Sequence, residues 1–222
     1  MSITRDDLVE RARALVPALR ERAETAEKER RMPEETHRDF LEADLYRLFQ
    51  PRRFGGHEMD LGLMVDVAAE VGRGCGSSAW NLTNLAVQAW IHGMHRPETQ
   101  EEVWGDAPKA LIASSFPGKG SSVKRVDGGL VVDGLWSFAS GVDVADWKNL
   151  QIFVPKEGGP PDHYFGLIPK SDYEIVDDWF VTGLAATGSR SIKLSDVFIP
   201  DKRLQFTPNI KGGETPGSAI NP

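Results

Sequence analysis

The sequence predicts an α+β protein in which an all-helical N-terminal domain precedes a β-barrel or β-sandwich domain. Apolar residues recur at helical spacing up to about residue 104, whereas short β-rich runs separated by Gly, Pro and Asp clusters begin near residue 110. This change of period places residues 1–108 in the helical domain and residues 109–205 in a middle β domain. Residues 206–222 contain little periodicity and are expected to be a linker.

Four or five helices are expected in the first domain. Thr4, with Asp7 three residues later, caps an amphipathic helix that runs to about residue 28, and Pro17 is expected to bend or interrupt it. Pro33 opens a second helix at the favoured first-turn position. A third helix is expected from about Asp60 to Arg73, where helical spacing of apolar residues ends in a glycine-rich break.

A fourth helix, from Ala79 to about His95 with Ser77 or Ser78 as its cap, has an unusual polar and aromatic stripe. The stripe consists of side chains at four-residue steps, which share one helix face: Trp80, Asn84, Gln88 and His92. These side chains either face water or line a ligand cavity, and tryptophan is a poor residue for open solvent. The cavity is therefore favoured. One more short helix is expected from Glu98 to Trp104.

The second domain is expected to consist of short strands. The β-rich runs are residues 111–116, 123–126, 130–132, 150–154, 164–168 and 192–199. Asp127-Gly-Gly129 is a clear hairpin turn between two of them. Because the helices and strands are segregated along the chain, the arrangement indicates an α+β fold or two domains, with the boundary near residue 108.

The central stretch of the sequence runs from Asp133 to Trp147. Trp136 and Phe138 alternate with small residues at the period of a strand, and Gly141 is expected to end that strand. Rings supply contact area and hydroxyls fix orientation, so such a strand edge suits a flat ligand with polar edges. A buried tryptophan strand closed by a glycine turn is the alternative interpretation.

Composition excludes several classes of function. The net charge of −7 and the absence of a Lys/Arg run argue against a nucleic-acid surface. Cys75 is the single cysteine, which excludes an internal disulfide and fits a reducing cytoplasm; it is expected to be a packed small residue. No apolar run approaches the ~20 residues of a membrane span. His92 and His95 lack an acidic residue at metal-binding spacing, so no metal site is expected.

Several weak motifs occur in an informative order. They are Arg31-Met-Pro-Glu34, Leu41 to Leu48, Phe54-Gly-Gly56, Ser77-Ser-Ala-Trp80, Ser114 to Ser121, Asp133 to Trp147, Gly183 to Ser189 and Val197-Phe-Ile-Pro200. Together they resemble the acyl-CoA dehydrogenase fold over nearly the whole chain. In this resemblance the small-residue loop from Ser114 to Ser121 lies at the flavin edge.

Trp136-Ser-Phe-Ala-Ser-Gly141 resembles the flavin-dependent monooxygenases of that fold more than the dehydrogenases. This branch includes the oxygenase components of two-component 4-hydroxyphenylacetate and hydroxysteroid hydroxylases, and dibenzothiophene oxygenases. The resemblance implies reduced FMN or FAD supplied by a separate flavin reductase, and O2. It also implies a C4a-hydroperoxyflavin that hydroxylates a small aromatic or polycyclic substrate. Members continue into a C-terminal helical bundle, with which they form homotetramers, and that bundle is absent from these 222 residues.

The resemblance also implies roles for individual residues. Ser140 matches the catalytic serine near flavin N5. The expected flavin contacts are Ser114, Ser115, Phe116, Trp136, Phe138, Ser140 and Gly141. The expected substrate contacts are Trp80, Asn84, Gln88 and Ser115. Phenol hydroxylases of this branch carry a histidine where this chain has Gln88, and an amide cannot act as a base near neutral pH. His92, one turn further, is the candidate to replace it as a catalytic residue.

Two other functions stay open at this stage. The first is an acyl-CoA dehydrogenase that performs FAD-dependent α,β-desaturation, because its catalytic glutamate would usually lie in the part of the fold that is absent here. The second is a non-catalytic fragment that binds a partner chain.

Overall fold

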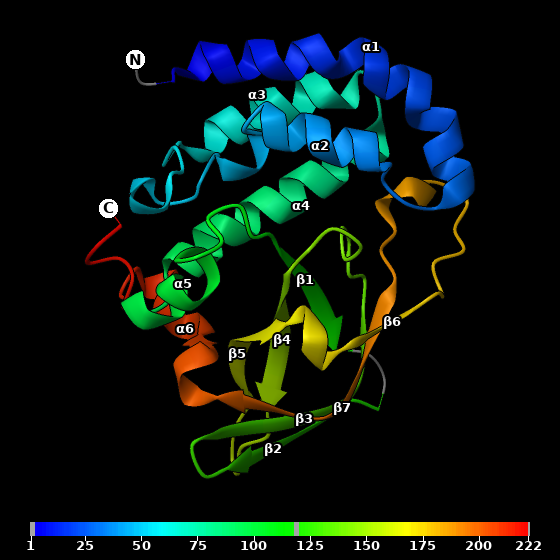
Figure 1. Ribbon diagram of the computed structural model, residues 1–222. Coiled ribbons are helices and arrows are strands. Elements are labelled where there is room, and N and C mark those ends of the chain that lie inside the picture. Colours follow the sequence, from blue (N-terminus) through cyan, green and yellow to red (C-terminus); the bar gives the residue numbers. More distant parts are fainter. Residues whose placement is uncertain (1–2, 118–119, 222) are drawn as a thin grey trace.

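A computed structural model describes residues 3–117 and 120–221. Helices form one end of the molecule and a mixed β-sheet forms the other, with α4 lying between the outer helices and strand β1 (Figure 1). The order of helices followed by strands confirms the predicted α+β class. Two separate cores support it, one among the helices around Leu8, Phe40 and Leu63, the other within the sheet around Trp136 and Leu150.

Six α-helices occur in the described part of the chain. They are α1 (Arg5–Glu29), α2 (Glu34–Glu42), α3 (Leu61–Gly72), α4 (Gly76–Gly93), α5 (Pro97–Trp104) and α6 (Thr207–Gly212). Short 3₁₀ turns are η1 (Leu45–Arg47), η2 (Arg52–Phe54), η3 (Lys170–Asp172), η4 (Ala185–Thr187) and η5 (Asp201–Arg203).

The helix signals in the sequence act largely as expected. Thr4 and Asp7 form the reciprocal capping box at the start of α1, and the Asp60 side chain caps α3 by accepting from Leu63 N–H at 3.0 Å. Pro17 lies inside α1 without interrupting it, and Figure 1 shows the helix turning in its later part. The predicted serine cap of α4 is wrong. The helix already begins at Gly76, so Ser77 and Ser78 lie within its first turn rather than before it.

The strands are β1 (Ile112–Pro117), β2 (Ser122–Val126), β3 (Gly129–Ser137), β4 (Trp147–Val154), β5 (Asp162–Pro169), β6 (Glu174–Val176), β7 (Ser191–Pro200) and β8 (Leu204–Phe206). Their order is β6-β7-β3-β1-β4-β5-β8, with β2 pairing with β3 as the predicted hairpin. Among the strand pairs of residues 3–117 and 120–221, β1 with β4 is the only parallel pair and the others are antiparallel. Strands β6 and β8 have three residues each, too few for a periodic signal in the sequence.

The central strand ends earlier than the sequence indicates. β3 stops at Ser137, and Phe138 adopts a left-handed backbone with φ of 59°. This conformation breaks the alternation, so Trp136 is fully buried whereas Phe138 is exposed. The prediction that Gly141 ends the strand is therefore wrong, and the turn of residues 138–141 leaves the sheet and approaches α4.

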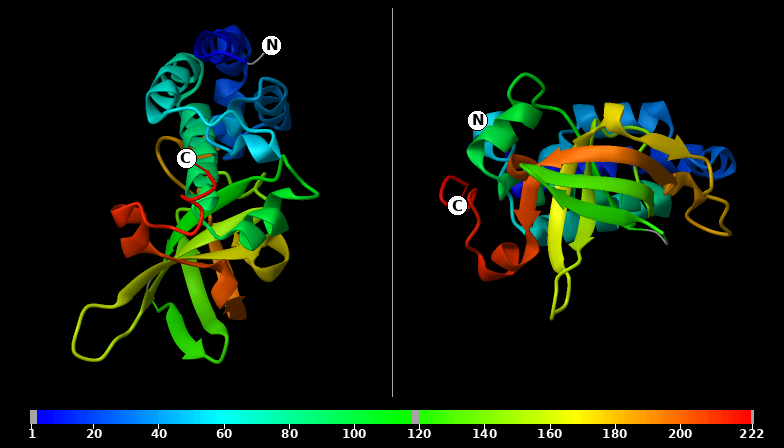
Figure 2. Two further views of the ribbon diagram at one scale, coloured as in Figure 1. Left: turned by 90° about the vertical axis from the view of Figure 1, so that its left-hand side faces the viewer. Right: turned by 90° about the horizontal axis from the view of Figure 1, so that it is seen from below.

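The segment expected to be a linker packs against the helices (Figure 2). Gly217 N–H donates to the Met94 carbonyl at 3.0 Å, and the Asn221 amide donates to the Gly93 carbonyl at 2.6 Å. A Cβ at Gly217 would lie 2.0 Å from the Gly93 oxygen, so only glycine permits this close approach. The segment thus covers the C-terminal end of α4.

Within the described ranges, no helix combines the length and apolar character that crossing a bilayer requires. Across the same residues, no group of three His, Cys, Asp or Glu side chains is arranged to hold a metal ion. Cys75 is buried and unpaired at the start of α4.

Candidate functional site

A hollow of about 250 Å³ lies where α4, the end of β1, the 138–141 turn and the 179–189 loop meet. Six of its lining side chains are ones that the sequence predicts as site residues: Trp80, Asn84, Ser114, Phe116, Phe138 and Ser140. Four others come from the loop between β6 and β7: Trp179, Leu184, Thr187 and Ser189. None of these ten residues is ionisable, so the part of the wall that the described residues form is neutral.

Aromatic rings form much of the wall. Trp80, Phe116 and Phe138 are exposed by 50%, 50% and 59%, which is high for rings gathered in one hollow. Phe138 meets Trp179 edge to face, with ring centroids 6.0 Å apart. Its left-handed backbone carries a cost, and such strain concentrates at functional sites. Exposed rings around a concave surface are suited to cover a flat ligand.

A chain of hydroxyl groups lies beside these rings. The Trp80 indole donates to Ser140 Oγ at 3.0 Å, and Ser140 Oγ lies 2.7 Å from Ser189 Oγ. Ser189 Oγ in turn lies 2.7 Å from Thr187 Oγ1. Ser140 is almost fully buried, so its position in the hollow is fixed by these partners.

Three of the predicted flavin contacts do not line the hollow. Trp136 is buried in the β core, where its indole donates to the Gln151 carbonyl at 2.9 Å. Ser115 is also fully buried, and its hydroxyl has no hydrogen-bond partner among the described residues. Gly141, with φ of 72°, allows the turn to approach α4, since a Cβ there would lie 3.0 Å from Leu85 side-chain atoms.

The stripe on α4 divides into two parts. Trp80 and Asn84 line the hollow, whereas Gln88 is buried and its Oε1 accepts a 2.9 Å hydrogen bond from Asn149 Nδ2. His92 is buried further along, edge-on to Trp104 at 4.6 Å between ring centroids and beside His95. Neither Gln88 nor His92 lines the hollow in the structure.

The loop residues Trp179, Leu184, Thr187 and Ser189 were not predicted as site residues. For Leu184, Thr187 and Ser189 the signal in the sequence is the motif from Gly183 to Ser189, which has no periodicity and no charged side chain. Trp179 lies outside that motif. In the fold, the segment from β6 to β7 extends from the sheet to the C-terminal end of α1 (Figure 1).

Glu27 of α1 forms hydrogen bonds both to the loop between β6 and β7 and to α4. Its carboxylate accepts from Ala185 N–H at 2.7 Å and from Ala186 N–H at 3.2 Å, at the start of η4. The same carboxylate accepts the Ser77 hydroxyl in the first turn of α4. One half-buried side chain thus joins three elements, two of which line the hollow.

Arg30 holds the same loop from the next turn. Its guanidinium makes a bidentate pair with Asp177, both distances 2.8 Å, which lowers the pKa of the Asp177 carboxyl. It also lies 4.0 Å from the centroid of the Phe180 ring. These contacts set the path of the chain on both sides of Trp179.

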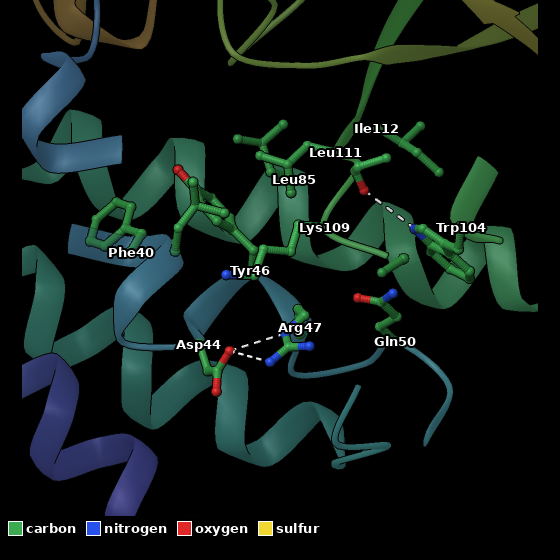
Figure 3. Close-up of a pocket in the computed structure, with 13 residues that line it drawn as sticks. Phe40, Asp44, Tyr46, Arg47, Gln50, Leu85, Trp104, Lys109, Leu111 and Ile112 are labelled. Atoms are coloured by element: carbon green, nitrogen blue, oxygen red, sulfur yellow. Dashed lines mark hydrogen bonds and ion pairs between the residues drawn. The ribbon is translucent and has the colours of Figure 1, made fainter. Parts of the chain in front are cut away.

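Another cleft, between η1 and the start of β1, is too small for a ligand (Figure 3). Its walls include Tyr46, Leu85 and Trp104, and the Asp44–Arg47 ion pair lies at its edge. Its volume of about 10 Å³ is near the minimum for a single water.

Comparison with known proteins agrees with this architecture. Residues 4–104 match the acyl-CoA dehydrogenase N-terminal domain. The flavin-dependent monooxygenase oxygenase subunit HsaA of Rhodococcus jostii (strain RHA1) is 38% identical over 196 residues, 88% of this chain and 51% of that protein. The crystal structure of the HsaA monooxygenase from M. tuberculosis superposes with a TM-score of 0.93 and 34% identity, covering 99% of this chain and 57% of that chain. Residues 4–104 thus form an acyl-CoA dehydrogenase N-terminal domain, and nearly the whole chain is similar to oxygenase subunits of flavin-dependent monooxygenases.

Two further relatives extend the comparison. The oxygenase component of p-hydroxyphenylacetate 3-hydroxylase from Acinetobacter baumannii is 32% identical over 97% of this chain and 51% of its own length. XiaF from Streptomyces sp., in complex with FADH2 and glycerol, has a TM-score of 0.83 and 31% identity, over 91% of this chain and 51% of that chain. The chain spans about half the length of the curated relatives it matches.

The residues of the hollow fit a flavin. Isoalloxazine is a flat tricyclic ring with polar edges, and the exposed rings of Trp80, Phe116 and Phe138 supply apolar faces of that kind. The hydroxyls of Ser114 and Ser140 line the same hollow, so they supply polar contacts for such edges. A reduced flavin held by these residues would supply the electrons that activate O2.

Acid is expected to destabilise the fold through the buried histidines. Burial lowers the pKa of His95 to about 4, so the unfolded chain binds a proton below pH 6.5 that the folded chain does not. Stability from this residue is complete above pH 6.5 and is lost as the pH falls toward 4. Between pH 7 and pH 5 the loss is about 2 kcal/mol. Urea unfolding at both pH values measures it, and His95→Leu should flatten the dependence; an unchanged slope would contradict the assignment.

Removing the Glu27 carboxylate should loosen the loop. Glu27→Ala deletes three hydrogen bonds, so we expect a loss of about 2–3 kcal/mol in the free energy of unfolding. The emission of Trp80 and Trp179 should shift as their surroundings open. Glu24→Ala, one turn earlier on α1 in an exposed pair with Lys28, is the matched control and should change stability by less than about 0.5 kcal/mol. Equal effects of the two substitutions would argue against the role of Glu27.

Proposed function

We propose that this protein is the oxygenase component of a two-component flavin-dependent monooxygenase, which uses reduced flavin and O2 to hydroxylate an aromatic or polycyclic substrate. The neutral hollow with exposed rings and a fixed hydroxyl chain is the observation that carries the proposal. Relatives named as flavin-dependent hydroxylases support it.

In this proposal each side chain has a distinct part. Phe116, Phe138 and Trp80 cover the ring system and keep water away from it. Ser140 holds a ring N–H through its oxygen, in a position that Trp80 and Ser189 fix. Ser114 meets the polar rim of the flavin or the substrate. Asn84 contributes an amide for a hydroxyl or carbonyl of the substrate.

The hollow favours a substrate that binds in neutral form. Among the described residues no ionisable side chain lines it, and the amide of Gln88 is already paired with Asn149. The described residues therefore offer binding and orientation rather than a base. Relatives carry names such as resorcinol hydroxylase and p-hydroxyphenylacetate 3-hydroxylase, which suggests hydroxylated aromatic rings as the class to screen first.

The remaining features of the proposal concern partners and location. A flavin reductase supplies reduced FMN or FAD, and the complete assembly is a homotetramer that includes a C-terminal helical domain. The location is the cytoplasm, which the buried free thiol of Cys75 fits.

Anaerobic mixing with reduced FMN or FAD, followed by a pulse of O2, tests the function. A flavin absorbance that persists after the pulse, with hydroxylated product from an aromatic substrate, supports oxygenation. Reduction of bound oxidised FAD by an acyl-CoA without O2 would instead support a dehydrogenase. If neither flavin binds, the chain acts without this cofactor and the proposal fails.

Ser140→Ala should weaken binding of reduced flavin by about tenfold, the contribution of one well-formed hydrogen bond. Anaerobic fluorescence titration measures the Kd. Ser137→Ala is the matched control, because Ser137 lies three residues earlier and bonds to Ser191 rather than lining the hollow. An unchanged Kd for the Ser140 variant would remove Ser140 from the site.

A further inference from the structure

The hydroxyl chain at the hollow has only one possible direction. It begins at the Leu184 carbonyl, which accepts but never donates, and which lies 2.8 Å from Thr187 Oγ1. A threonine hydroxyl carries one proton, so this contact uses it. Toward Ser189, Thr187 therefore acts as the acceptor, although the 2.7 Å separation alone leaves the donor open.

The same count fixes the next two bonds. Ser189 donates its single proton to Thr187, so it must act as the acceptor at its 2.7 Å contact with Ser140. Ser140 therefore donates its own hydroxyl proton to Ser189. At its other contact it accepts from the Trp80 indole at 3.0 Å, a group that can only donate.

Ser140 consequently has no proton left for a ligand. Of its two lone pairs, one accepts from Trp80 and the other is free on the side of the hollow. The hydroxyl is therefore a pure acceptor for any ligand bound there. This property comes from Thr187 and Leu184, which lie at the other end of the chain of bonds.

We propose that Thr187, acting through Ser189 and Ser140, makes the site select reduced over oxidised flavin. Reduction converts the flavin ring nitrogen N5 from a hydrogen-bond acceptor into an N–H donor. An acceptor-only Ser140 pairs with the reduced form and faces a second lone pair in the oxidised form. Thr187 is thus a positioning residue that determines the redox state bound. This inference rests on the proposed function, since it requires flavin in the hollow.

Thr187→Val tests the inference by removing the Thr187 hydroxyl, the acceptor for Ser189 that fixes which way the hydroxyls donate along the chain. Ser189 is then free to donate to Ser140, and Ser140 to donate to oxidised N5. We expect the ratio of the oxidised to the reduced Kd to fall by about tenfold, the size of one hydrogen bond. The main change should be tighter binding of oxidised flavin. Thr187→Ser keeps the hydroxyl and is expected to keep the wild-type ratio.

Both Kd values are measured by titration with oxidised flavin in air and with dithionite-reduced flavin under anaerobic conditions. A ratio of two affinities cancels general damage to the hollow, and thermal unfolding shows whether each variant folds. A ratio for Thr187→Val equal to that of the wild type overturns the inference while leaving the proposed function intact. Failure of the wild-type protein to bind either form overturns both.

Discussion

The Glu27 carboxylate is the contact on which the site depends. It accepts two backbone N–H groups of η4 and the hydroxyl of Ser77, so α1, α4 and the β6–β7 loop are joined at one point. A carboxylate is suited to this because its two oxygens offer about four acceptor positions. This junction adds to the 3.4 Å hydrogen bond from the Asn81 amide to the Ala186 carbonyl and to the 3.3 Å bond from Gly141 N–H to the Thr187 carbonyl. Together these contacts bring the hydroxyls of Thr187 and Ser189 to that of Ser140.

The hydrogen-bonding character of the hollow depends on which hydroxyls donate their single proton, rather than on charged side chains. Ionisable groups are absent from the residues that line the hollow in the described structure, while arginine and carboxylate pairs such as Arg30–Asp177 lie behind the loop. A neutral, ring-lined site keeps stray proton donors away from a reactive cofactor. Direction is supplied instead by a carbonyl at one end of the hydroxyl chain and an indole at the other.

Local signals in the sequence predicted many of the elements. The Thr4 capping box and the hairpin at Asp127 to Gly129 each depend on neighbouring residues, and the structure has both. Predictions failed where contacts between distant segments decide. Ser114 and Ser115 are adjacent in β1 and point to opposite faces, and only the packing of the sheet decides that Ser114 reaches the hollow.

The sequence by itself determined the class of fold, the order of helices and strands, and the aromatic and serine residues around Ser140 that indicate a flat ligand. These follow from periodicity and from short-range motifs. Tertiary structure alone decided which of them share a surface. Phe138 leaves the strand pattern, His92 is buried beside Trp104, and the Thr187 hydroxyl is linked to that of Ser140 through Ser189. The reason is that a hydrogen bond between Ser140 and Ser189, 49 positions apart, depends on the folded path of the chain. Contacts between distant segments, such as that of Glu27 with Ala185 158 positions later, help to fix that path.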